Sequence, residues 1–208
     1  MSNPRDPRPQ LIALAQRFHS RGWMPGTSGL LSCRQADGSV EVSAPGRTKD
    51  QLREDDFITL AMDGRVMRQV RPQDRPSADS IIHLALYERF PQARLIVQLH
   101  MIEAPLVARM CLEDELLLPN LELLKGFGVW EQAPEVTVPV FENHLDVPRI
   151  AGEIRARMAA SPPRVPGLLI RDQGLTVWGP TVAAVCNHVE LFEYLFRYMV
   201  TARMAGLD

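Results

Sequence analysis

The chain has 208 residues, of which 46% are hydrophobic and 23% are charged, and its formal net charge is −2 at pH 7. This length fits one domain with a sizeable buried core. The balanced charge excludes the basic footprint of a nucleic-acid-binding protein, and no apolar run approaches the roughly 20 residues needed to cross a bilayer. We therefore expect a cytoplasmic globular protein that binds neither nucleic acid nor membranes.

The first ten residues are polar and rich in proline, which is unlike a secretory signal peptide. We expect residues 1–10 to form a flexible leader and residues 11–208 to form a single domain. The cysteines are odd in number and far apart, which argues against a disulfide framework or a zinc ribbon. Each is predicted to be a small buried apolar residue: Cys33, Cys111 and Cys186.

The N-terminal half predicts a helix, two hairpins and a second helix. Apolar residues from Leu11 to Phe18 follow helical spacing, and that helix should end near Ser20. Turns at Asp37-Gly38 and Asp63-Gly64 separate short strand-like runs. Those strands are expected at residues 30–34, 40–43, 57–62 and 65–68. Pro76-Ser77 then opens a helix in which Ser77 is a natural N-cap.

The C-terminal half mixes strands and helices without a strict βαβ rhythm. Strands are expected at residues 94–99, 136–140, 168–171 and 175–178, the last two as a hairpin around residues 172–174. Helices are expected at residues 102–110, 121–127, 147–160 and from about 181 to 204. This order predicts a largely antiparallel sheet with helices on its faces, an α+β or α/β three-layer body.

Two loops combine small residues with hydroxyl and basic groups. Residues 21–29 read Arg-Gly-Trp-Met-Pro-Gly-Thr-Ser-Gly, and residues 43–49 read Ser-Ala-Pro-Gly-Arg-Thr-Lys. Small residues let backbone N–H groups approach an anion closely, and the hydroxyls and lysine add donors and charge. Loops of this composition are also common as plain turns, and the Pro-Ser-Ala at residues 76–78 also suits an ordinary helix cap.

The strand that ends at residues 98–100 carries a glutamine and a histidine on one face. Side chains two apart on a strand point the same way, so Gln98 and His100 should lie together. Two histidines at this spacing would hold a metal, whereas one histidine and one glutamine would not. Alone, His100 is more typical of a polar residue at a strand end. His83 lies on the apolar helix and is predicted to be a packed histidine.

In their order and spacing, these segments resemble the class II aldolase/adducin family of sugar-phosphate lyases. The resemblance covers about residues 18–196 and includes several further motifs. They are Leu-Glu-Leu-Leu-Lys at 121–125, Val-Pro-Val-Phe at 138–141, Leu-Ile-Arg at 169–171, Gly-Leu at 174–175 and Trp-Gly at 178–179. The resemblance implies a three-layer α/β/α fold with a central, mostly antiparallel sheet. It also implies a homo-oligomer, a tetramer, that binds a phosphorylated sugar or a similar small molecule.

The same resemblance implies roles for individual residues. Glu122 corresponds to the family's catalytic acid/base. Asp79 stands where the family has a glutamate, and Leu30 replaces an asparagine of the phosphate loop. The residues implied to bind the phosphate or the rest of the substrate are Thr27, Ser28, Gly29, Ser43, Gly46, Lys49 and Ser77.

The family's zinc is held by three histidines, which correspond here to Gln98, His100 and Gln173. Zinc would polarise a carbonyl group of the substrate. A glutamine oxygen is a neutral, hard and weak ligand that suits magnesium or calcium better than zinc. We therefore expect zinc to bind weakly or not at all. Asp172 could replace a ligand only if it pointed into the site, and in an extended segment it would point away from Gln173.

Three hypotheses follow for the function. The first is a diverged sugar-phosphate lyase with Glu122 as acid/base. The second is a non-catalytic binding protein, as adducin-like members of the family are. The third is a metal-free enzyme with a different substrate in the same pocket.

Overall fold

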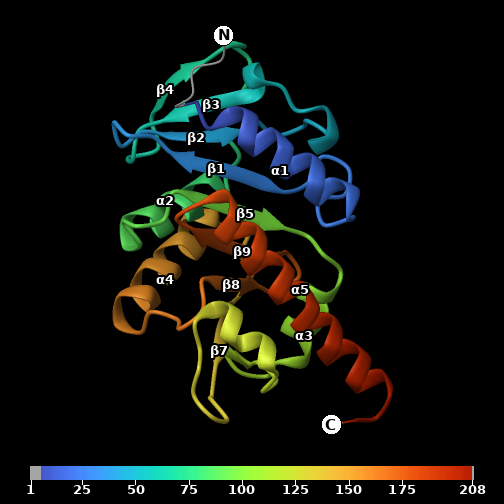
Figure 1. Cartoon of the computed structure of the whole chain (residues 1–208). Coiled ribbons are helices and arrows are strands. Elements are labelled where there is room, and N and C mark those ends of the chain that lie inside the picture. Colours follow the sequence, from blue (N-terminus) through green and yellow to red (C-terminus); the bar gives the residue numbers. More distant parts are fainter. Residues whose placement is uncertain (1–5, 208) are drawn as a thin grey trace.

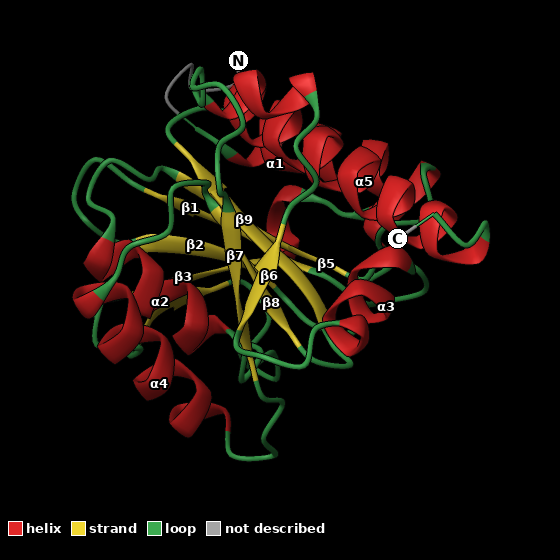
Figure 2. Cartoon of the chain, turned by 90° about the horizontal axis from the view of Figure 1, so that it is seen from below, coloured by secondary structure: helices red, strands yellow, loops and turns green. Residues whose placement is uncertain are grey.

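The computed structural model describes residues 6–207, which fold into three layers around one sheet (Figures 1 and 2). Nine strands lie in the order β4-β3-β2-β1-β5-β9-β8-β7-β6. Every neighbouring pair is antiparallel except β7 and β8. The strands are β1 (Leu30–Arg34), β2 (Val40–Ser43), β3 (Phe57–Leu60), β4 (Val66–Gln69), β5 (Leu95–Leu99), β6 (Glu115–Leu117), β7 (Thr137–Phe141), β8 (Gly167–Ile170) and β9 (Gly174–Gly179).

Helices cover both faces of the sheet, which confirms the predicted α/β/α class. Figure 2 shows α2 (Ser80–Arg89) and α4 (Val147–Ala160) on one face. The other face is covered by α1 (Arg8–Ser20), α3 (Glu103–Met110) and α5 (Val182–Met204). Short 3₁₀ helices complete the described chain: η1 (Lys49–Gln51), η2 (Glu54–Asp56) and η3 (Glu122–Phe127).

Alternation along β5 divides the core into two layers. Leu95, Val97 and Leu99 enter the cluster under α1, α3 and α5, whereas Ile96 enters the cluster under α2 and α4. Burying one such side chain contributes about 1.5–3 kcal/mol, which favours this register over a slipped one. Gln98 shares the face of Ile96, so the register directs a buried amide toward α2.

The start of α2 differs from the sequence prediction, and Ser77 does not cap it. The helix begins at Ser80, and residues 77–80 form a turn in which the Ser80 N–H donates to the Ser77 carbonyl at 3.0 Å. Ser77 Oγ accepts from the N–H of Asp79 at 3.3 Å. The extra turn places Asp79 at the cap position, and its side chain caps no helix N–H.

Smaller differences concern a strand and the cysteines. The edge strand β6 was not predicted, because three residues are too short to show a period of two. Cys33 is buried as expected, whereas Cys111 and Cys186 are only half-buried, so the prediction for these two is wrong; all three are free thiols.

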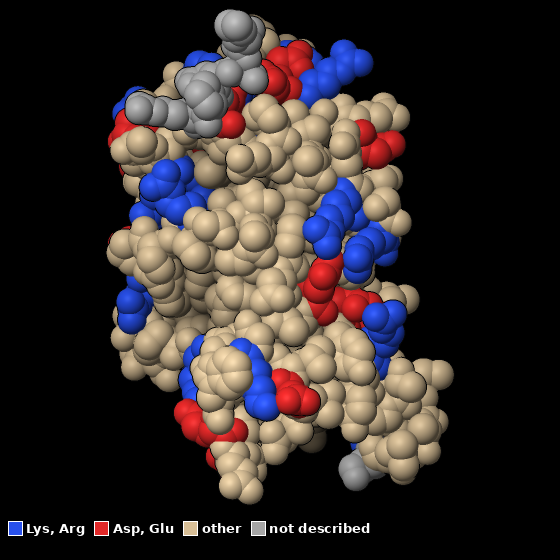
Figure 3. Space-filling view, viewed as in Figure 1, with Lys and Arg blue, Asp and Glu red and all other residues tan. Residues whose placement is uncertain are grey.

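Among residues 6–207, no helix is both long enough and apolar enough to cross a bilayer. On the face shown in Figure 3, basic and acidic residues alternate in small groups. This face therefore shows no large patch of a single sign of the kind that binds nucleic acid. The first five residues of the predicted leader lie outside the described part of the chain.

Candidate functional site

The candidate site forms at one end of three adjacent strands. Gln98 of β5 is paired with Leu30 of β1 on one side and with Thr176 of β9 on the other. The loop that ends at Gly29 and the turn that contains Gln173 therefore meet the end of β5. Sequence spacing alone did not reveal this meeting, because it depends on the strand order.

Gly174 makes the close approach possible. Its φ is +148°, and a Cβ there would lie 2.1 Å from the carbonyl oxygen of Leu99. Only glycine fits such a position. The approach brings the Gln173 backbone to His100, whose Nδ1 donates to the Gln173 carbonyl at 2.6 Å. In the neutral ring this leaves Nε2 of His100 as an acceptor.

A cavity of about 170 Å³ opens at this strand end and collects most of the predicted residues. The structure brings together Thr27, Ser28, Gly29, Ser43, Ser77, Gln98 and His100, with Leu30, Pro45 and Asp79 beside them. Small and hydroxyl-bearing residues thus face one hollow from three loops. Their roles in binding remain predictions, but their convergence is a property of the fold.

Two glutamine amides hold the carboxylate of Asp79. Gln98 Nε2 donates to Asp79 Oδ2 at 3.2 Å, and Gln173 Nε2 donates to the same oxygen at 3.1 Å. An ionised carboxylate only accepts hydrogen bonds, so both amide nitrogens must face it. The carbonyl oxygens of both amides are buried and have no partner within the described chain.

These residues do not fit zinc. Zinc sites in proteins use imidazole nitrogen, thiolate or carboxylate ligands, and three or four of them converge on one point. Here only His100 offers an imidazole nitrogen, and both amides direct N–H groups toward the carboxylate that could have joined it. In the described range, no group of three or more His, Cys, Asp or Glu side chains could hold a metal ion.

A second hollow of about 610 Å³ shares His100 with the first. Gln173, Glu193 and Arg197 also line it, so it widens the site toward α5. Glu193 is buried and accepts from Arg197 Nη2 at 2.8 Å. Burial raises the pKa of Glu193, although Arg197 opposes the shift. Sequence reasoning missed Glu193; its place among the buried apolar residues of α5 was the available signal.

Lys49 is the last residue of the second predicted phosphate loop and contacts both loops. It is fully buried, and its Nζ donates to the carbonyls of Thr27 at 2.9 Å and Arg47 at 3.1 Å. Burial lowers the pKa of Lys49 to about 8. Because both partners are neutral, the ammonium charge is not compensated by these contacts. Lys49 therefore ties the two loops together and places a positive charge near the cavity.

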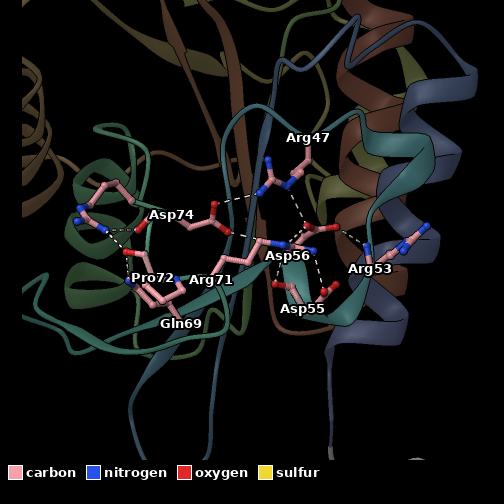
Figure 4. A network of polar contacts seen from close by, with 9 residues as sticks. Arg47, Arg53, Asp55, Asp56, Gln69, Arg71, Pro72 and Asp74 are labelled. Carbon is pink, nitrogen blue, oxygen red and sulfur yellow. Dashed lines mark hydrogen bonds and ion pairs between the residues drawn. The ribbon is translucent and has the colours of Figure 1, made fainter.

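Gly46 lies in a neighbouring hollow, beside a network of ion pairs shown in Figure 4. Asp56 accepts from Arg47 at 2.9 Å and from Arg71 at 2.6 Å, and Asp74 accepts from Arg47 at 3.0 Å. Burial opposes ionisation of Asp56, but hydrogen bonds from Arg53, Arg47 and Arg71 give it a lowered pKa. The network anchors the loop of residues 44–49.

Glu122 lies apart from both cavities. It is on η3, its side chain is 81% exposed, and Lys125 donates to it at 2.8 Å. The hydrogen bond and charge of Lys125 lower the pKa of Glu122. Asp172 lines the larger hollow with His100 and Gln173. It lies in a turn rather than in an extended segment, and its carboxylate accepts from Arg109 at 2.6 Å.

His83 is a packed histidine, as predicted. It is fully buried, and its Nδ1 lies 2.7 Å from Ser32 Oγ. Burial lowers the pKa of His83 to about 3, so the ring is neutral. A ring held inside the α2 layer does not replace a missing metal ligand in the cavity.

Comparison with known proteins finds similar sequences along nearly the whole chain. The model of the class II aldolase and adducin N-terminal domain matches residues 9–200. A methylthioribulose-1-phosphate dehydratase from Microcystis aeruginosa is 45% identical over 197 residues, covering 95% of this chain and 96% of the relative. A protein of the same name from Leptospira biflexa is 34% identical, covering 91% of this chain and 94% of the relative.

Solved structures show the same fold at lower sequence identity. An L-fuculose 1-phosphate aldolase superposes with a TM-score of 0.78 at 20% identity, covering 99% of this chain and 90% of that one. The L-fuculose-1-phosphate aldolase of Thermus thermophilus has a TM-score of 0.74 at 18% identity, covering 97% and 99%. At this identity the likeness supports the fold class alone.

Proposed function

The chain belongs to the class II aldolase and adducin family and is a lyase of that type, and we propose that it removes water from a phosphorylated ketose such as methylthioribulose 1-phosphate. The observation that carries the proposal is the cavity in which the hydroxyl-rich loops face His100 and Asp79. The relatives named as dehydratases match nearly the whole chain, which supports the same reaction class.

The proposed binding mode places the phosphate at the loops of residues 27–29 and 43–49. Thr27 and Ser43 offer hydroxyl donors there, and buried Lys49 contributes positive charge. Ser28 lines the same cavity, where its hydroxyl and its N–H both donate to the Pro25 carbonyl. The remainder of the substrate would extend toward His100 and the larger hollow. Such a molecule is a small phosphorylated sugar rather than a polymer.

The reaction requires that a proton next to the carbonyl be removed and that a hydroxyl group leave as water. We propose Glu122 as the acid/base, in keeping with the family resemblance. Because Glu122 lies outside both cavities, this role requires a ligand or a second copy of the chain to bring it to the substrate. Glu193, which lines the larger hollow and is buried, is a second candidate for moving a proton.

A metal-free enzyme with altered chemistry is the second candidate function. The hydrogen bonds from Gln98 and Gln173 to Asp79 favour it, because they use the zinc positions for a different purpose.

The test is turnover of methylthioribulose 1-phosphate by the purified protein, with and without added zinc. Glu122→Gln should lower kcat by about 10²- to 10⁴-fold, the usual contribution of a positioned acid/base. Glu193→Gln is assayed in parallel, and Glu88→Gln, an exposed glutamate on α2, is the control. Absence of turnover by the wild-type protein on this substrate would favour the metal-free enzyme with a different substrate. Full activity of Glu122→Gln would remove Glu122 from the proposal.

A further inference from the structure

Asp79 occupies a helix-cap position but serves another purpose. Aspartate is among the preferred N-cap residues because its carboxylate accepts from the first turn. At the start of α2, the Asp79 side chain makes no such bond, and Oδ2 accepts from Gln98 and Gln173 instead. One oxygen of the carboxylate is thereby fixed at the floor of the small cavity.

The orientation of the two amides leaves acceptors where the two hollows meet. Gln98 lines the small cavity, Gln173 lines the larger hollow, and His100 lines both. With both nitrogens facing Asp79 Oδ2, the carbonyl oxygens of Gln98 and Gln173 turn away from it, buried and without a donor in residues 6–207. The other oxygen, Asp79 Oδ1, also receives no hydrogen bond from the described residues. Nε2 of His100 adds a fourth acceptor, because Nδ1 is already engaged.

Buried acceptors without donors are costly, so their presence in a cavity indicates a ligand that donates. A cation complements these acceptors poorly. The amide N–H groups occupy Oδ2, and in a planar amide the oxygen points away from the contact made by the nitrogen. A single ion therefore cannot contact Oδ2 and both carbonyl oxygens in this arrangement. Several hydroxyl groups, each bringing its own donor, match the set.

We propose that Gln98 and Gln173 are positioning residues that hold Asp79 as a hydroxyl-binding subsite for the polyol part of the substrate, in place of the family's zinc centre. The proposal rests on the proposed function, which supplies the phosphate at the other end of the cavity. Asp79 Oδ1 and the glutamine carbonyls accept from vicinal hydroxyls, and the binding requires no metal.

The experiment is calorimetric titration of the full chain, with chelator present, using two probes. Inorganic phosphate reports on the anion loops, and ribitol 5-phosphate reports on the loops and the hydroxyl subsite together. Asp79→Asn keeps the volume of the side chain but directs an N–H group into the cavity where an acceptor is needed. We expect it to weaken ribitol 5-phosphate binding by about ten- to a hundredfold and to leave phosphate binding unchanged or tighter.

A further variant keeps the test decisive if Asp79→Asn fails to fold. Gln173→Leu, at a half-buried position, removes one of the two hydrogen bonds to Asp79 Oδ2. It should lower the affinity for ribitol 5-phosphate by about tenfold and leave the affinity for inorganic phosphate unchanged. The exposed pair Asp63→Asn and Gln73→Leu are matched controls and should change neither affinity. Thermal unfolding establishes that each variant is folded before titration.

The outcomes separate this inference from the proposed function. If the wild-type protein binds neither probe, the proposed function fails. If it binds both and Asp79→Asn or Gln173→Leu weakens them equally or not at all, the hydroxyl subsite is wrong. Binding of ribitol 5-phosphate that disappears with chelator, or stoichiometric zinc in the purified protein by elemental analysis, would also overturn the inference. The double variant Gln98→His plus Gln173→His should acquire zinc that the native chain lacks.

Discussion

The buried ammonium group of Lys49, beside neutral carbonyls, has a lower pKa than that of an exposed lysine. Lys49 has no carboxylate among its two contacts, and its pKa is near 8. The unfolded chain protonates this amine up to about pH 10.4. Between these values the unfolded state binds more protons, so stability should rise with pH through this window. The charge on Lys49 thus costs stability, which suggests that it is kept for an anion.

Sulfate binding tests this role of Lys49, since the charge of sulfate does not change over the relevant pH range. The free protein loses the Lys49 charge as pH rises through about 8, so sulfate affinity should be higher at pH 7 than at pH 9. Lys49→Gln should bind weakly at both values, with little pH dependence. The control is Arg65→Gln, an exposed arginine in the β3–β4 turn. Equal affinity at both pH values in the wild-type protein would contradict the prediction.

At the scale of elements, the site depends on how closely the turn before β9 approaches the end of β5. The contact between His100 and the Gln173 carbonyl exists because Gly174 lets the two backbones meet. The loop of residues 44–49 is fixed independently by the ion pairs around Asp56. These two sets of contacts lie on different segments, so a substitution that disrupts one set should leave the other intact.

Gly174→Ala tests the first set of contacts. A Cβ 2.1 Å from the Leu99 carbonyl oxygen must displace backbone, and the cost should be about 3 kcal/mol or more in the free energy of unfolding. Chemical denaturation measures it directly. Gly128→Ala is the control, because its φ is also positive but nothing lies within 4 Å of the added Cβ, so its cost should be about 1 kcal/mol. Similar losses for both variants would show that the close approach is not decisive.

On the surface of the molecule, α3 and its N-cap residue carry an exposed stripe of apolar side chains. Ile102, Leu106 and Met110 are four residues apart and are 72%, 42% and 40% exposed, while Ala104, Val107 and Ala108 of the same helix are buried. Spacing of four places the three on one side of the helix. Because the family resemblance implies a homo-oligomer, we expect this stripe to be part of a contact between copies.

Leu106→Asp should therefore shift the protein to a smaller species, as measured by light scattering after size exclusion at a fixed concentration. A charge in a dry contact between subunits is strongly unfavourable. Met67→Asp, at an exposed position of the edge strand β4, is the control and should leave the mass unchanged. A wild-type protein that is monomeric at every concentration would contradict the predicted oligomer.

Much of this architecture was readable from the sequence. The alternation at residues 95–99, the turns at Asp37-Gly38 and Asp63-Gly64, and the apolar spacing of the helices placed nearly every element within a few residues. The exceptions were the short strand β6, the 3₁₀ helices η1 and η2, and the start of α2. Each involves only three or four residues, which is too short to show a period in the sequence.

The sequence by itself determined the residue types in the pocket, including glutamine at two of the three positions where the family resemblance implies zinc-binding histidines, because the motifs and their spacing are local properties. Only the tertiary structure decided what replaced them. The order β1-β5-β9 brings Gln98 and Gln173 to Asp79. The packing of α5 places Glu193 at the neighbouring hollow, and Glu122 lies exposed on η3. Such partnerships arise from strand pairing over long separations, and a linear pattern does not encode which donors will share one acceptor.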